Sequence, residues 1–160
     1  MWSFDDGLTW TNSIPANNYW EGIEFGNHTF VVTAGNTQVG VVRNTDTITS
    51  ISWGENSYSA GSPINRDSGK ISYNNGIFYC FAAYRESTYY SYSADGLGWT
   101  NVALPKSAYH GDYGHCRATF GPNGEMYIAD VISNSIWVNP TPTQSESWRI
   151  LSPTGIDKYQ

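Results

Sequence analysis

The sequence predicts an all-β protein built from repeated units of short strands, and three observations favour this fold class. Aromatic residues make up 16% of the 160 residues and charged residues only 14%, with many Gly, Asn, Ser and Thr. This balance is typical of short strands joined by tight turns. No segment repeats apolar residues at the spacing of about 3.6 that an amphipathic helix requires. Tryptophans and turn signals recur with one period, and we expect one domain over residues 1–160.

Two independent sets of markers define the period. Tryptophans that each follow a small residue are separated by 43, 46 and 49 residues: Trp10, Trp53, Trp99 and Trp148. Turn signals follow an aromatic residue at spacings of 48 and 47 residues: Phe25, Tyr73 and Phe120. The agreement of the two sets indicates a structural repeat.

Each unit is expected to contain four short strands. In the clearest unit they cover 70–73, 77–83, 87–93 and 99–104. The second strand of every unit is apolar on both sides, so both of its sides must be covered. Four-stranded antiparallel sheets stacked face to face meet that demand, and a stack of units of roughly 40–50 residues predicts a β-propeller. A β-sandwich or a β-solenoid is the alternative, but a sandwich need not repeat and a solenoid coil is shorter.

The expected boundaries are a partial blade at 1–15 and three blades at about 19–56, 66–105 and 115–153. That amounts to about three and a half blades per chain, whereas a closed propeller has about four to eight. An open arc would expose apolar sheet faces. We therefore expect completion either by self-association, with a two-chain ring as the simplest case, or by a further segment of polypeptide.

One kind of turn occurs twice, as Ser3-Phe4-Asp5-Asp6-Gly7-Leu8-Thr9-Trp10 and as Ser93-Ala94-Asp95-Gly96-Leu97-Gly98-Trp99. An Asp side chain can accept hydrogen bonds from backbone N–H groups two or more residues on, and a following Gly allows positive φ. These turns resemble the Asp-box, or bacterial neuraminidase repeat, found in sialidases, some polysaccharide lyases and many non-enzymatic propellers. The segment from Trp20 to Val32 is also similar to repeats of phage tail and adhesion propellers.

The resemblance implies that these turns join the third and fourth strands, on the rim away from the ligand face. Their residues are then structural and not catalytic: Ser3, Asp5, Gly7, Trp10, Ser93, Asp95, Gly96 and Trp99. At 44–46 and 143–145 the turn is degenerate, and only the Trp of the repeat remains.

Two long connections, 54–68 and 105–115, are expected to lie on the ligand face. The candidate ligand-binding residues come from these connections and the strand that follows: Arg66, Asp67, Tyr109, His110, Asp112, Tyr113, His115 and Arg117. Aromatic rings beside charged groups suit a sugar, which stacks its C–H faces and hydrogen-bonds its hydroxyls. The leading hypothesis is a non-catalytic, lectin-like module for a glycan or cell-surface polysaccharide.

Two alternatives belong to other classes. In a glycosidase or polysaccharide lyase, His115 and Tyr113 would form an acid–base pair. A sialidase would also need a third arginine beside Arg66 and Arg117, and none stands in a matching context. The other alternative is a structural, self-assembling module. We expect no metal, because His110, Asp112 and His115 lack a fourth ligand, and no cofactor.

Charge and hydropathy exclude several partners. The net charge of −6 and the pI of about 4.8 disfavour nucleic acid and anionic membrane surfaces. No apolar run of about 18 residues and no signal-peptide pattern occur, so we expect neither membrane insertion nor an export signal. The phage-tail likeness is compatible with a virion-associated or extracellular location.

Cys80 and Cys116 are expected as buried thiols, with a disulfide as the alternative. The sequon at Asn27 falls in a hairpin turn and is not expected to be glycosylated.

Overall fold

The computed structural model describes residues 5–10, 20–34, 38–43, 54–57, 70–81, 89–104, 118–130, 135–144 and 147–151. Within these residues the protein is all-β, and its strands form three antiparallel sheets of four strands each. The predicted fold class, all-β with four-stranded antiparallel sheets, is confirmed. In the same part of the chain no helix is long and apolar enough to span a bilayer.

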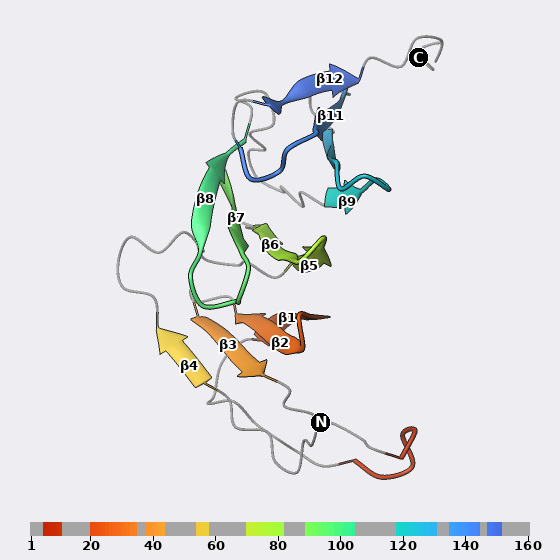
Figure 1. Ribbon diagram of the computed structural model, residues 1–160. Coiled ribbons are helices and arrows are strands. Elements are labelled where there is room, and N and C mark those ends of the chain that lie inside the picture. Colours follow the sequence, from red (N-terminus) through yellow and green to blue (C-terminus); the bar gives the residue numbers. More distant parts are fainter. Residues whose placement is uncertain are drawn as a thin grey trace.

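Each sheet consists of four strands that are consecutive in the sequence, and each strand is hydrogen-bonded to the next (Figure 1). Sheet 1 contains β1 (Trp20–Gly26), β2 (Thr29–Ala34), β3 (Gln38–Arg43) and β4 (Gly54–Ser57). Sheet 2 contains β5 (Lys70–Asn74), β6 (Ile77–Phe81), β7 (Tyr89–Ser93) and β8 (Thr100–Ala103). Sheet 3 contains β9 (Ala118–Phe120), β10 (Met126–Asp130), β11 (Ser135–Asn139) and β12 (Arg149–Leu151).

The first two strands of each sheet are joined by tight turns whose residues permit left-handed backbone. Asn27 and Asn75 both have φ of 47°, and Gly76 and Gly124 have φ of 83° and 88°. Asn and Gly are the residues that tolerate positive φ at least cost. The turn residues therefore determine where each first hairpin reverses direction.

The three sheets have equivalent registers. In sheet 2, Ile71 pairs with Cys80 and Tyr73 pairs with Phe78. The same positions of sheet 1 pair Ile23 with Val32 and Phe25 with Phe30, and those of sheet 3 pair Ala118 with Ile128 and Phe120 with Met126. Side chains directly opposite each other share one face. We call this face, which in sheets 2 and 3 packs on the preceding sheet, the leading face; the opposite one is the trailing face.

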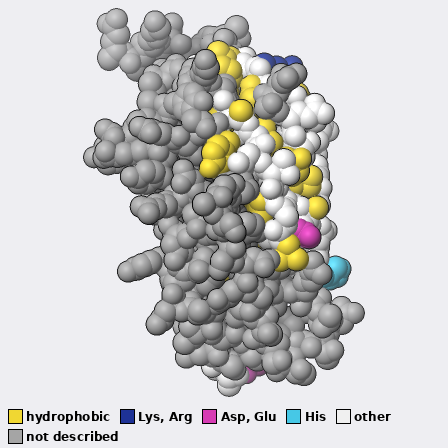
Figure 2. Space-filling view, turned by 90° about the vertical axis from the view of Figure 1, so that its left-hand side faces the viewer, with side chains coloured by type: hydrophobic (Ala, Val, Ile, Leu, Met, Phe, Trp, Pro, Cys, Tyr) yellow, Lys and Arg dark blue, Asp and Glu magenta, His cyan; other side chains and the backbone are white. Residues whose placement is uncertain are grey.

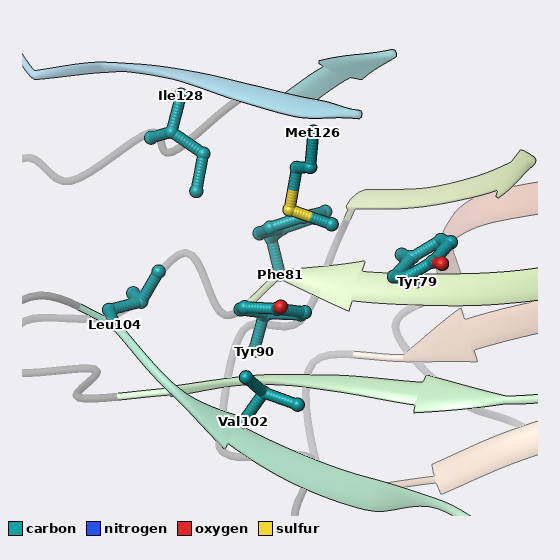
Figure 3. Packing of buried hydrophobic residues seen from close by; sticks show 7 residues of the cluster. All are labelled: Tyr79, Phe81, Tyr90, Val102, Leu104, Met126 and Ile128. Atoms are coloured by element: carbon teal, nitrogen blue, oxygen red, sulfur yellow. The ribbon is translucent and has the colours of Figure 1, made fainter. Parts of the chain in front are cut away.

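The hydrophobic core lies between the sheets. Val31 on the trailing face of sheet 1 packs with Ile71, Phe78 and Cys80 on the leading face of sheet 2. A second cluster joins the trailing face of sheet 2 to the leading face of sheet 3 (Figure 3), and its buried members are Tyr79, Phe81, Tyr90, Val102, Leu104, Met126 and Ile128. Sheet 2 is therefore covered on both faces, which explains why β6 is apolar on both sides.

Candidate functional site

The turn between β7 and β8 is organised by the Asp95 carboxylate. Asp95 Oδ1 accepts hydrogen bonds from the backbone N–H groups of Leu97 (2.8 Å) and Gly98 (3.0 Å). Ser93 Oγ accepts from the Gly96 N–H at 2.8 Å and donates to Asp95 Oδ1 at 3.1 Å. Gly96 has φ of 76°, a conformation that strains other residues. The Asp95 side chain thus stabilises its own hairpin.

The indole of Trp99 closes the same turn, because its Nε1 donates to the Gly96 carbonyl at 2.9 Å. The Asp5 turn repeats this contact, with Trp10 Nε1 donating to the Gly7 carbonyl at 2.9 Å. Asp5 Oδ1 accepts from the Thr9 N–H at 2.8 Å, as Asp95 accepts from its own turn. The two turns therefore share their chemistry despite one residue of difference in length. Ser3 lies outside the described residues.

The turn between β11 and β12 is closed by Asn139, which sequence reasoning missed. Asn139 Oδ1 accepts from the Thr141 N–H at 2.9 Å, and its Nδ2 donates to the Gln144 carbonyl at 2.8 Å. Asn139 pairs with Met126 as Ser93 pairs with Phe78, so it occupies the position of Ser93. The signal was present in the sequence as an Asx residue at the end of the third strand.

Trp148 matches Trp99 in sequence but makes a different contact. Its Nε1 donates to the Ala103 carbonyl of sheet 2 at 3.2 Å, and its ring lies 6.1 Å from that of Tyr90, edge to face. Trp148 thus joins sheet 3 to sheet 2 instead of closing its own turn.

Tyr90 is the central buried polar residue between sheets 2 and 3. Its ring stacks on Phe81 with centroids 5.4 Å apart, and its hydroxyl donates to the Pro142 carbonyl and accepts from Asn139 Nδ2 at 3.5 Å. Burial, and secondarily the neighbouring Tyr79, raise the pKa of the Tyr90 phenol well above its ordinary range. A neutral phenol that donates a hydrogen bond is therefore part of this interface.

Asn27 links sheet 1 to sheet 2 through the turns. Its Nδ2 donates to the carbonyls of Gly76 (2.9 Å) and Ala94 (3.3 Å), and its Oδ1 accepts from the Tyr73 hydroxyl at 2.7 Å. A glycan on this nitrogen would replace one of its two N–H donors, so at least one of the two carbonyl contacts would be lost.

Asn75 and Asn123 stand at the positions equivalent to Asn27 in sheets 2 and 3. A Cβ on Gly124 would lie 2.3 Å from Asn75 Nδ2, so Asn75 reaches the next turn as Asn27 does. Asn123 Nδ2 instead donates to Glu125 Oε1 at 2.9 Å, and the Asn123 N–H donates to Glu125 Oε2 at 3.2 Å. The hydrogen bond from the Asn123 side chain is the main cause that lowers the pKa of the Glu125 carboxyl.

The first and third turns of the three sheets lie at one end of the sheets. The strands of each sheet alternate in direction, so the first and third turns of a sheet share an end, and the bond from Asn27 to the Ala94 carbonyl joins a first turn to a third one directly. The long connections, from Ser57 to Lys70 and from Leu104 to Ala118, start and finish at the opposite end. Figure 2 shows hydrophobic and uncharged polar groups over most of the described part of one side of the molecule, with few charged groups among them.

All of the predicted ligand-binding residues lie outside the described residues: Arg66, Asp67, Tyr109, His110, Asp112, Tyr113, His115 and Arg117. Trp53 and Cys116 also lie outside them. Cys80 is described and is buried between sheets 1 and 2, as expected. Among the described residues, no group of three His, Cys, Asp or Glu side chains could hold a metal ion.

Comparison with protein-family models, with curated proteins and with solved structures gave no match for this chain.

Proposed function

We propose that the three sheets are consecutive blades of a β-propeller of the Asp-box type, and that the protein binds a glycan at the end of the sheets opposite the Asp95 turn. Three consecutive four-stranded antiparallel sheets that pack face to face support the propeller. The shared closure of the Asp5 and Asp95 turns by a Trp indole supports the Asp-box type.

One observation carries the glycan site: the polar side chains at one end of the sheets are bound to backbone groups, whereas the long connections begin and finish at the other end. At the turn end, the side chains of Asn27, Asp95 and Asn139 are bound to their own or neighbouring backbone. Both long connections begin and finish at the other end, and their sequences carry tyrosines beside Arg, Asp and His. Aromatic faces and charged donors on long connections are the groups that recognise sugars.

A glycan array tests this proposal with the whole chain and three variants. Tyr113→Ala and Arg66→Ala each remove one proposed contact, and Pro122→Ala changes an exposed residue of the β9–β10 turn at the opposite end. We expect the unaltered chain and Pro122→Ala to bind the same glycans. The two site variants should bind them at least about tenfold more weakly, a loss of ~1.4 kcal/mol.

Retained binding in both Tyr113→Ala and Arg66→Ala would place the ligand elsewhere, and an array without any bound glycan would remove the proposal. Product analysis of the bound glycans separates a lectin from an enzyme. Cleavage that is lost in His115→Ala would identify a glycosidase or lyase instead.

A further inference from the structure

Sheet 1 exposes apolar side chains at positions that are covered in the next sheet. Ile23 on its leading face is 62% exposed, whereas Ile71 at the equivalent position of sheet 2 is 9% exposed beneath sheet 1. The ring of the exposed Phe25 lies 4.5 Å from the ring of Phe30, centroid to centroid. The equivalent pair on the leading face of sheet 2, which packs on sheet 1, is Tyr73 with Phe78, whose ring centroids are 4.8 Å apart. The leading face of sheet 1 therefore has the composition of an interface between sheets.

Sheet 3 exposes apolar side chains on the complementary face, next to the buried Val138. Ile136 and Leu151 pair across β11 and β12 on its trailing face and are 44% and 39% exposed. The equivalent pair in sheet 2 is Tyr90 with Val102, which are 1% and 3% exposed beneath sheet 3. Exposed apolar groups at both ends of the row of sheets are thus the counterparts of groups that are buried between sheets.

The first and the last sheet of the row expose apolar side chains on different faces. Both interfaces among the described sheets join a trailing face to a leading face, and apolar side chains are exposed on the leading face of sheet 1 and on the trailing face of sheet 3. We propose that the leading face of sheet 1 packs on the trailing face of sheet 3 of a second copy of this chain, head to tail, as the sheets pack within one chain. The interface continues an arrangement that the chain already makes twice, and it is heterologous because the two faces differ.

The β1–β2 turn of sheet 1 and the β9–β10 turn of sheet 3 also have the residues that the proposed contact between two copies requires. His28 stands at the position of Gly76 and Gly124, where the Asn of the preceding turn makes its contact. In the second copy that Asn is Asn123, which is held back on Glu125 and leaves room for a side chain at position 28. The proposed contact also brings the exposed His28 side chain toward the Glu125 carboxylate, which can accept a hydrogen bond from an imidazole N–H group.

Two copies are the expected assembly. A heterologous contact either closes into a ring or continues as a fibre. Two chains supply six described sheets, or about seven blades when the expected partial blade of residues 1–15 is counted in each chain, and both numbers lie within the range of about four to eight blades of closed propellers. The contact itself depends on the sheet packing and not on glycan binding, and only the closure at two copies rests on the proposed propeller. Mass measurement and the glycan array can therefore fail separately.

Sedimentation equilibrium and light scattering on the whole chain provide the first test. We expect a species of twice 17.8 kDa that persists on dilution to low micromolar concentration. A mass of 17.8 kDa at every concentration would overturn the proposal, whatever the variants do. A mass that grows without limit as the concentration rises would overturn the closed pair.

Matched variants identify the faces. Leu151→Asp alters the trailing face of sheet 3, and Ile23→Asp alters the leading face of sheet 1. Ile150→Asp is the control, because Ile150 is an equally apolar and exposed neighbour whose equivalent in sheet 2, Asn101, is itself exposed. We expect Leu151→Asp and Ile23→Asp to have the mass of one chain and Ile150→Asp to keep the mass of two.

A mixture of the two single-chain variants gives the sharpest result. Leu151→Asp retains an intact leading face and Ile23→Asp an intact trailing face, so one good interface can form between them. We expect the mixture to recover a species of two chains that neither variant forms alone, with near-ultraviolet circular dichroism showing that both are folded. Dissociation by only one of the two substitutions, or failure of the folded variants to recover in the mixture, would overturn the head-to-tail contact.

Discussion

At the scale of single residues, acidic and amide side chains in this protein mainly replace backbone hydrogen-bond partners in turns. Asp5, Asp95 and Asn139 each accept an N–H group within their own turn. Asn27 does the same between sheets, where its amide donates to backbone carbonyls. This use gives all four side chains a structural role and assigns none of them to catalysis.

The first prediction concerns Asp95. Asp95→Ala leaves the N–H groups of Leu97 and Gly98 without their acceptor and should lower the free energy of unfolding by about 1–2 kcal/mol. Asp95→Asn keeps one acceptor oxygen and should cost less. Urea unfolding followed by tryptophan fluorescence measures both. Equal loss in the two variants, or none in Asp95→Ala, would contradict the assigned role.

The second prediction concerns Tyr90 and alkaline pH. Because the pKa of its phenol is raised in the folded state, the unfolded chain loses this proton first as the pH rises. The stabilising contribution is complete below the ordinary value of 10.0 and declines above it, toward the folded-state pKa.

Tyr90→Phe should therefore lower stability by about 1–2 kcal/mol at neutral pH, through loss of the bond to the Pro142 carbonyl. It should also flatten the decline of stability above pH 10.0. Thermal unfolding from pH 7 to 11 measures both effects, and Tyr127→Phe, a less buried tyrosine of β10, is the control. An unchanged alkaline slope in Tyr90→Phe would show that another group is responsible.

At the scale of elements, the sequence predicted the strands better than the contacts between them. Asn-Gly turns and continuous apolar runs such as Phe78–Phe81 indicated the hairpins, because both depend on residues close in the chain. The link from Asn27 to Gly76 and Ala94 spans 49 and 67 residues and has no local signal. Trp99 and Trp148 are equivalent in sequence, yet only Trp99 has a glycine carbonyl within reach in its own turn.

The third prediction compares two glycines in equivalent turns. Gly76 and Gly124 both have positive φ, so Ala at either position should cost about 1 kcal/mol from the backbone alone. A Cβ at Gly76 meets open space, whereas a Cβ at Gly124 lies 2.3 Å from Asn75 Nδ2. Gly124→Ala should therefore be the more destabilising by about 0.5–1 kcal/mol, since Asn75 must move.

Gly76→Ala is the control for Gly124→Ala, because both variants have the same backbone strain and differ only in the contact between sheets. Equilibrium unfolding in urea measures the difference. Gly76→Ala being as harmful as Gly124→Ala would mean that the Asn75 contact contributes nothing to the packing of sheet 2 on sheet 3.

At the scale of the whole molecule, the described sheets form a row in which each sheet packs on its neighbours. The local stability of a sheet should therefore be higher when both of its faces are covered than when one is. Among the described residues, sheet 2 packs on a neighbouring sheet with both faces, and sheets 1 and 3 each do so with one face. In a row of this kind each contact contributes mainly to the two sheets that it joins. The candidate ligand residues stay a prediction from the composition of the long connections, because their mutual positions depend on how the sheets are arranged and not on local sequence.

Hydrogen exchange provides the prediction at this scale. In Leu151→Asp, which should separate the two copies, sheets 1 and 3 lose a covered face and their amides in β1, β2, β10 and β11 should exchange faster than in the unaltered chain. Amides of β6 should change least, because both faces of sheet 2 remain covered. Ile150→Asp should leave the pattern of the unaltered chain. Acceleration confined to sheet 3 would mean a local effect of the substitution, whereas acceleration in sheet 1, far from position 151 in the sequence, is the effect that only loss of the head-to-tail contact explains.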